Sequence, residues 1–141
     1  MSALLAWHLL MTAAYAGFQW TIQLLVYRQF SLVPAEKFPA YEQAHQTRVS
    51  YVVGPLFLGL VITTGLLLVE RPDGTPWAAA VAAAVLLAGI LAVTALAAVP
   101  LHARLGHEFS ETAWRALLRW DLVRAVLATA NAGLALWLVL R

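Results

Sequence analysis

Glu42 and His45 stand at a spacing that suits metal or proton chemistry. They are three positions apart, so both side chains would project from one face of a helix. Glu-x-x-His is a ligand pair of di-iron helical bundles, but such a site needs a second pair, and the sequence has none. We therefore interpret Glu42, His45 and His102 either as ligands of a single metal or as interfacial and packing side chains.

Histidines also suit proton transfer, because a neutral imidazole can accept a proton near neutral pH. His45 and His102 are thus the candidate catalytic residues, and the same rings are candidate hydrogen-bond donors or axial ligands of a haem. The sequence does not identify a cofactor, and haem or a single metal are the candidates.

Arginine and amide side chains lie inside apolar stretches, where polar groups are expensive and usually functional. Arg124 follows Asp121 at a spacing that allows the two to pair on a helix, and Asn131 lies seven residues further on the same face. Arg48 and Arg124 are candidates for binding an anionic ligand group. Trp20 and Trp120 are candidates for flat apolar walls.

A polar stripe runs along the first apolar stretch, where His8, Thr12, Gln19 and Gln23 recur at steps that combine into one helix face. Such a face turns inward in lipid. It serves either for hydrogen bonds between helices, at about 0.6 kcal/mol each, or as the wall of a ligand cavity. The candidate ligand-binding residues are Gln19, Trp20, Gln23, Tyr27, Arg48, Trp120, Arg124 and Asn131.

The composition indicates an integral membrane protein. The chain has 141 residues, of which 62% are hydrophobic and 11% charged, whereas a soluble domain carries about 25% charged residues. The net charge of +2 is small, so we expect no nucleic-acid partner. No cysteine is present, which excludes disulfides and thiolate chemistry.

Four apolar stretches are each at least as long as the ~20 residues that a spanning helix needs. They cover residues 3–27, 41–69, 77–105 and 112–140. Because only helices and closed barrels span lipid, and these stretches are too long for barrel strands, we predict an all-α fold. The chain, residues 1–141, is then a single domain, a four-helix transmembrane bundle with up-and-down topology.

Local signals place some of the helix ends. Ser110 is an expected N-cap of the fourth helix, with Phe109 and Trp114 spaced as a hydrophobic staple. Thr75 is an expected cap of the third helix, with Pro76 in its first position. Ala14-Tyr15-Ala16 resembles a signal-peptide cleavage site, but the apolar run continues beyond it, so we expect an uncleaved first span.

The basic residues predict the orientation in the membrane. Seven lie in or beside the first and third connections, namely Arg28, Lys37, Arg48, Arg104, Arg115, Arg119 and Arg124, against Arg71 and Arg141 elsewhere. Since basic loops stay in the cytoplasm, we expect both termini outside. The tryptophans at positions 7, 77 and 137 would then line the outer interface.

Short motifs in all four stretches resemble one family of small proteins. They are Gln23-Leu24-Leu25-Val26-Tyr27, Phe38-x-x-Tyr41-x-x-x-His45-x-x-Arg48, Val53-Gly54-Pro55, Val99-Pro100-Leu101-His102 and Trp120-x-x-x-Arg124. Together they resemble small four-helix bacterial membrane proteins of the anthrone-oxygenase-like group. The resemblance implies a multi-pass protein of the bacterial inner membrane and, in some members, cofactor-free oxygenation of an aromatic substrate by a histidine base. Where the resemblance places a histidine after the glutamine of the first helix, this chain has Val26.

Three functional hypotheses follow. The first is binding of a hydrophobic small molecule or redox cofactor, such as a quinone, polyaromatic compound or porphyrin, in a polar cavity near the cytoplasmic side. The second is a cofactor-free, oxygenase-like enzyme with a histidine base. The third is a non-catalytic membrane subunit, in a homo-oligomer or with a partner subunit, whose polar residues only fix the helix register.

Overall fold

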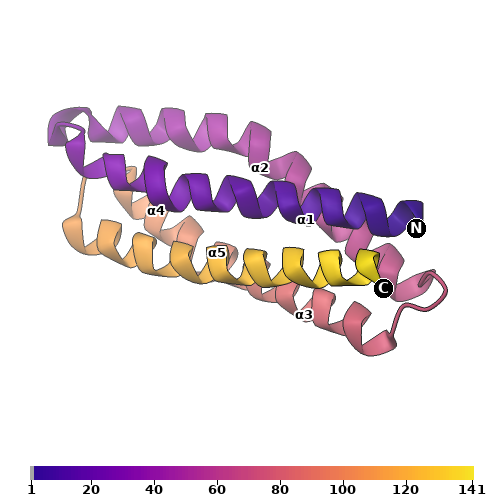
Figure 1. Cartoon of the computed structure of the whole chain (residues 1–141). Coiled ribbons are helices and arrows are strands. Elements are labelled where there is room, and N and C mark those ends of the chain that lie inside the picture. The colour runs from indigo at the N-terminus through magenta and orange to yellow at the C-terminus, as the bar shows by residue number, and fades with distance from the viewer. Residues whose placement is uncertain (1) are drawn as a thin grey trace.

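The computed structural model describes residues 2–141, which form an elongated bundle of long helices (Figure 1). The described residues contain four helical segments long and apolar enough to cross a membrane, and no strand. The segments are Ala3–Leu32, Ala35–Val69, Trp77–Leu105 and Glu111–Leu140. This confirms the all-α fold. A helix of 30 residues is about 45 Å long, so its ends extend beyond a hydrocarbon core of about 30 Å.

Several segments combine more than one kind of helical turn. The first consists of α1 (Ala3–Thr21), the π-helical turn η1 (Ile22–Val26) and the 3-10 turns η2 (Tyr27–Leu32). The second consists of η3 (Ala35–Lys37) and α2 (Phe38–Val69). The third consists of α3 (Trp77–Val93), a second π-helical turn η4 (Thr94–Ala98) and α4 (Val99–Leu105), and the fourth is α5 (Glu111–Leu140).

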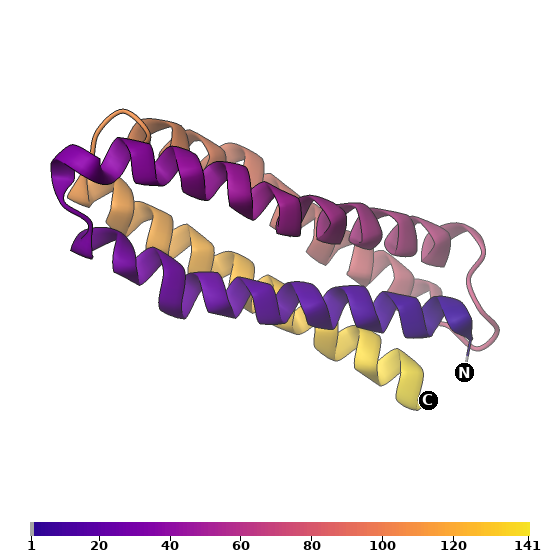
Figure 2. The same cartoon turned by 90° about the horizontal axis from the view of Figure 1, so that it is seen from above.

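Successive segments run in opposite directions and pack side by side. Helix α1 packs against α2 and α5, and α3 packs against the same two helices, so the four long helices form a ring. Both termini lie at one end together with the turn at residues 70–76 (Figure 2). The opposite end, which we call the basic end, carries the connections after Leu32 and after Leu105. The topology is therefore up-and-down.

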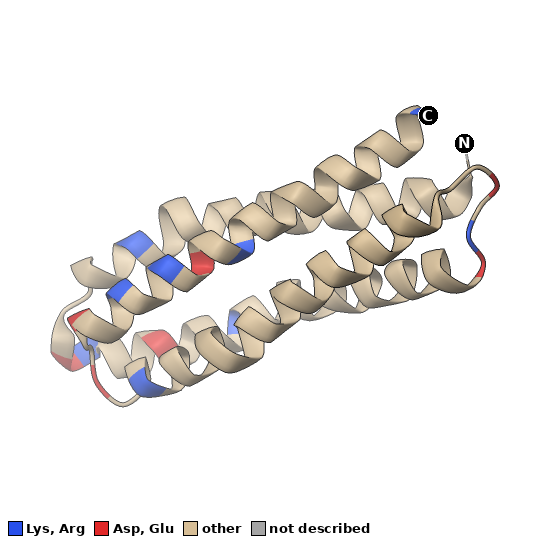
Figure 3. Cartoon of the chain, turned by 90° about the horizontal axis from the view of Figure 1, so that it is seen from below, with Lys and Arg blue, Asp and Glu red and all other residues tan. Residues whose placement is uncertain are grey.

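Charged residues gather towards the basic end (Figure 3). The other end carries the charges of the 70–76 turn and Arg141. The predicted orientation of the bundle in the membrane depends on this unequal distribution of charge between its two ends.

The helix ends follow the expected signals in part. The N–H of Ala113 donates to the Ser110 hydroxyl at 3.3 Å, and the Phe109 and Trp114 rings lie 6.2 Å apart, which confirms the cap and the staple. The expected Thr75 cap is wrong. Pro76 precedes the first residue of α3 with extended backbone, and its carbonyl accepts the N–H groups of Ala79 and Ala80.

Aromatic side chains close the bundle at the basic end. Phe30 and Phe38 are fully buried and lie 5.4 Å apart, and Phe109 packs on Phe38 at 5.0 Å. Leu105 and Leu117 complete the buried cluster around them. Polar side chains deeper in the bundle are therefore separated from this end by a packed apolar layer.

Candidate functional site

The two π-helical turns position the central side chains of the site. In each turn a backbone N–H reaches five residues back, from Tyr27 to Ile22 and from Val99 to Thr94. A π turn adds one residue to a helical turn and often marks a functional site, and one residue corresponds to a rotation of about 100°. Tyr27 and His102 both follow such a turn, so both face the interior at the same level.

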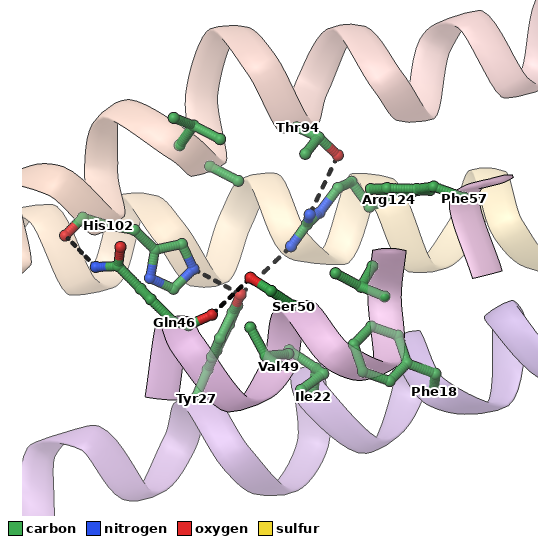
Figure 4. Close-up of a pocket in the computed structure, with 13 residues that line it drawn as sticks. Phe18, Ile22, Tyr27, Gln46, Val49, Ser50, Phe57, Thr94, His102 and Arg124 are labelled. Carbon is green, nitrogen blue, oxygen red and sulfur yellow. Dashed lines mark hydrogen bonds between the residues drawn. The ribbon is translucent and has the colours of Figure 1, made fainter. Parts of the chain in front are cut away.

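A chain of hydrogen bonds joins Arg124, Tyr27 and His102 across the bundle (Figure 4). Arg124 Nη2 donates to the Tyr27 hydroxyl at 3.4 Å, and that hydroxyl is 2.7 Å from His102 Nε2. A guanidinium only donates, so we assign the Tyr27 oxygen as acceptor from Arg124 and its proton to His102 Nε2. The indole of Trp114 donates to the Tyr27 carbonyl at 2.7 Å, which fixes the backbone at this position.

Glu42 holds the other side of the His102 ring. His102 Nδ1 is in hydrogen-bond contact with Glu42 Oε1, and Glu42 is completely buried. Gln46 donates to the same carboxylate oxygen at 3.1 Å and to the His102 carbonyl at 3.2 Å, so it ties α2 to α4. With Nε2 accepting from Tyr27, Nδ1 carries the proton and donates to Glu42. The chain thus has one direction, from Arg124 through Tyr27 and His102 to Glu42.

Asp121 and Gln19 complete the network on the side of α1 and α5. Arg124 Nη2 donates to Asp121 Oδ1 at 2.5 Å, and Gln19 Nε2 donates to the same oxygen at 2.5 Å. Asp121 is fully buried and Arg124 is 6% exposed. Removing one partner of such a buried pair leaves an uncompensated charge, so the pair holds the guanidinium in place.

A cavity of about 190 Å³ lies beside this network. Its polar groups come from Tyr27, Gln46, Ser50, Thr94, His102 and Arg124, and its apolar walls from Phe18, Ile22, Val49, Val53, Phe57, Ala98 and Val99. Arg124 Nη1 donates to Thr94 at 3.2 Å, which brings the guanidinium to the cavity wall. The cavity therefore combines an apolar surface with a few converging polar groups, as small-molecule sites do.

The cavity reaches the surface on the side where α2 faces η4 and α4. Ser50 on α2 and Val99 on α4 both line it and are exposed. Figure 4 shows Ser50 and Val49 on one side and Thr94 and His102 on the other. Since this surface belongs to the apolar spans, the opening faces the side of the bundle and not its closed basic end.

A larger hollow of about 630 Å³ lies at the opposite end, between Ser2, residues 72–75 and the last residues of α5. Its charged groups are Asp73 and Arg141, both exposed. It lacks a buried ionisable group on its wall within the described residues, so it is the weaker candidate site.

The structure brings together part of the predicted site. Tyr27, His102 and Arg124 line the cavity, and Gln19 and Glu42 join the same hydrogen-bond network. Gln23 is also buried, at 3% exposure, but neither Gln23 nor Gln19 lines the cavity. These inward positions follow from the cost of placing polar groups in lipid.

Four predicted ligand-binding residues lie elsewhere. Trp20 donates to Thr129 at 2.8 Å on the surface, and Trp120 is 46% exposed. Arg48 is exposed in a groove between α1 and α2. Asn131 is buried seven residues beyond Arg124, and the described residues offer its amide no hydrogen-bond partner.

The three predicted metal ligands do not converge on one point. His45 stacks on His102 with ring centroids 5.6 Å apart, while Glu42 and Tyr27 occupy the two ring nitrogens of His102. Among residues 2–141, His, Asp and Glu side chains form no group of three or more that could hold a metal ion. The residues present thus do not fit a single-metal site. The contact between Glu42 and His102 is a hydrogen bond, and it orients the imidazole ring.

Gln46 and Thr94 were missed as site residues. Gln46 stands four residues after Glu42, which is the spacing of neighbours on a helix face, so a signal for it was present. Thr94 gave no signal, because the π turn that begins there changes which residues of the segment face inward.

Comparison of the chain with models of protein families, with curated proteins and with solved structures finds no match. The functional argument therefore depends on the geometry of the cavity and its network.

Proposed function

We propose that this membrane protein binds a small, lipid-soluble aromatic carbonyl compound of the quinone class in the cavity beside Arg124. The observation that carries the proposal is an apolar cavity whose inner wall includes a buried, firmly held guanidinium. In the described part of the chain Arg124 has three acceptors, on Thr94, Tyr27 and Asp121. A guanidinium carries five N–H donors, and these bonds use three of them, so donors remain for a ligand oxygen.

The size of the cavity favours one or two rings. An apolar protein cavity of about 150 Å³ binds benzene, and this cavity measures about 190 Å³. Sites for larger ligands occupy about 300–1,000 Å³. A naphthoquinone-sized compound therefore suits the cavity better than a porphyrin.

The lateral opening supports uptake from the bilayer. Exposed Ser50 and Val99 flank the opening within segments that are apolar enough to span a membrane. An apolar ligand dissolved in lipid would reach the cavity without crossing water.

A second candidate function is the oxygenase-like enzyme that the sequence resemblance implies. The Glu42–His102 contact favours it, because a carboxylate that orients an imidazole is the usual support of a histidine base. In this structure the base nitrogen is bound to the Tyr27 hydroxyl, so His102 would act on a substrate through Tyr27.

The test is a comparison of two variants with the same substitution. Val49→Phe puts a larger side chain on the cavity wall, whereas Val126→Phe puts it on an exposed face of α5. Binding of 2,3-dimethyl-1,4-naphthoquinone to the detergent-purified protein is measured by calorimetry. We expect binding to wild type and Val126→Phe and its loss in Val49→Phe. Equal binding in all three would contradict this cavity as the site, and absence of binding to wild type would favour a non-catalytic subunit.

A further inference from the structure

We infer that the cavity takes an acidic aromatic hydroxyl compound, such as a naphthol or hydroxyquinone, and holds it as the anion, with its proton passed through Tyr27 and His102 to Glu42. This inference rests on the proposed function, since it adds a second class of ligand, in a defined ionic form, for the same cavity. It also gives Glu42 the role of proton acceptor, which the sequence did not predict.

The direction of the hydrogen bonds between Arg124, Tyr27, His102 and Glu42 supports proton transfer away from the ligand. Arg124 donates to Tyr27, Tyr27 to His102 Nε2, and His102 Nδ1 to Glu42. Every proton in this chain already points away from the cavity and towards the carboxylate. A chain with this polarity can accept a proton at the Tyr27 oxygen and cannot supply one without reversing all of its bonds.

The proton transfer balances without a redox partner. The O–H bond of the ligand breaks, and a new O–H bond forms at the Tyr27 oxygen. The original Tyr27 proton moves to His102 Nε2, the Nδ1 proton of His102 moves to the Glu42 carboxylate, and the ligand keeps its electron pair as an oxyanion. No electron is transferred.

Charge placement supports the same direction. The new negative charge on the ligand would lie beside the Arg124 guanidinium, which has donors to spare within the described residues. Glu42 receives the proton at a completely buried position, on the oxygen that already faces His102 Nδ1. The step therefore moves negative charge from an oxygen next to an imidazole to an oxygen next to a guanidinium.

The other charged neighbours leave this direction intact. Asp121 Oδ1 is paired with Arg124 at 2.5 Å and receives a second hydrogen bond from Gln19, while its Oδ2 has no hydrogen-bond partner among residues 2–141. His45 stacks on His102 and lies edge-on to Tyr27, and its Nε2 has no hydrogen-bond partner among residues 2–141. Neither group interrupts the contacts between Tyr27, His102 and Glu42.

Glu42 is then the residue that sets the tautomer of His102. Gln46 steadies the same carboxylate oxygen at 3.1 Å. In Glu42→Gln the amide oxygen can keep the hydrogen bonds from Gln46 and from His102 Nδ1, but an amide does not take up a proton as a carboxylate does. The proton relay would then end at His102, although the cavity walls would be unchanged.

The experiment uses 4-nitro-1-naphthol, whose neutral and anionic forms differ in colour, at a pH below its own pKa. Its absorption spectrum is recorded in the presence of excess full-length protein in detergent, for wild type, Tyr27→Phe, Glu42→Gln and the surface control Thr129→Val. Binding of neutral 2,3-dimethyl-1,4-naphthoquinone is measured on the same samples. The second ligand reports on the cavity alone.

We expect the anion-to-neutral ratio of the bound naphthol to exceed its ratio in protein-free detergent about tenfold or more, the effect of one hydrogen bond to a charged group. The ratio should return to the protein-free value in Tyr27→Phe and Glu42→Gln. It should stay high in Thr129→Val, which should also bind the quinone as wild type does. The histidine 15N spectrum of Glu42→Gln should show the same tautomer of His102 as wild type.

Three outcomes would overturn the inference. The first is a naphthol that stays neutral on wild type, and the second is an anion signal that persists in both variants. The third is binding of the quinone without binding of the naphthol. If wild type binds neither compound, the proposed function itself fails, which separates the two conclusions. A naphthol that stays neutral on wild type overturns the inference even if a variant does not fold.

Discussion

The hydroxyl of Tyr27 and Nε2 of His102 lie 2.7 Å apart in the bundle interior, although 75 positions separate them in the sequence. Each residue follows a π-helical turn, and each is tied to a further helix, Tyr27 to α5 through Arg124 and Trp114, and His102 to α2 through Glu42. All four membrane-spanning segments thus meet at one polar contact beside the cavity.

Removal of the Tyr27 hydroxyl should destabilise the bundle. Tyr27→Phe leaves the facing atoms of Arg124 and His102 without this partner, and an unsatisfied buried group costs about 1–3 kcal/mol. The matched control is Tyr51→Phe, because Tyr51 is 75% exposed. Unfolding in mixed detergent micelles measures both. Equal stability of the two variants would show that the contact contributes nothing.

The Asp121–Arg124 pair should behave as a unit. Asp121→Leu leaves a buried guanidinium without its carboxylate and should cost about 3–5 kcal/mol. The double variant Asp121→Leu/Arg124→Met, which has no buried charge, should recover most of that loss. The exposed pair of Glu111 and Arg115 is the comparison, since breaking a surface pair costs only about 0–1 kcal/mol. A double variant no more stable than Asp121→Leu would count against a buried ion pair.

The lateral opening can be followed by thiol chemistry, because the chain has no cysteine of its own. A Ser50→Cys variant should react with N-ethylmaleimide added to membranes, and bound 2,3-dimethyl-1,4-naphthoquinone should slow the reaction. The control is Val126→Cys, on a face of α5 remote from the cavity lining. Protection of both cysteines, or of neither, would argue against entry between α2 and α4.

The orientation in the membrane remains a prediction from the basic residues. Cysteine at position 37 should be labelled by a membrane-impermeant maleimide only after the cytoplasmic side is opened. Cysteine at position 73, in the 70–76 turn, should be labelled in intact cells. The reverse pattern would place the termini in the cytoplasm and the basic end outside.

The helices could be predicted from the sequence because lipid imposes long apolar runs. The third span was placed at residues 77–105, and the structure has Trp77–Leu105. The first span was expected to end at residue 27 but continues to Leu32, because η1 and η2 extend it with π and 3-10 turns. The Thr75 cap failed because the N–H of Thr75 closes a turn on Pro72, and Pro76 begins the helix instead.

The sequence predicts which polar side chains of the candidate site turn inward, because charged groups avoid lipid. Glu42, His102 and Arg124 were expected in the bundle interior because ionisable groups in a span turn inward, and the structure places all three in one hydrogen-bond network. Trp20, Arg48 and Trp120 were assigned to the cavity but lie outside its lining, Arg48 and Trp120 exposed and Trp20 half-buried, since spacing along one helix does not give its rotation relative to the others. The π turns change that rotation, and nothing in the local sequence announced them.

The most direct measurement compares two ligands of the same shape, 2,3-dimethyl-1,4-naphthoquinone and 2,3-dimethylnaphthalene, on the wild-type protein. Both should enter an apolar cavity, but only the quinone has oxygens for the remaining donors of Arg124. We predict that the quinone binds at least about tenfold more tightly, which corresponds to one hydrogen bond to a charged group. Equal affinities would contradict recognition by Arg124, and the absence of binding by either compound would contradict a ligand site in this bundle.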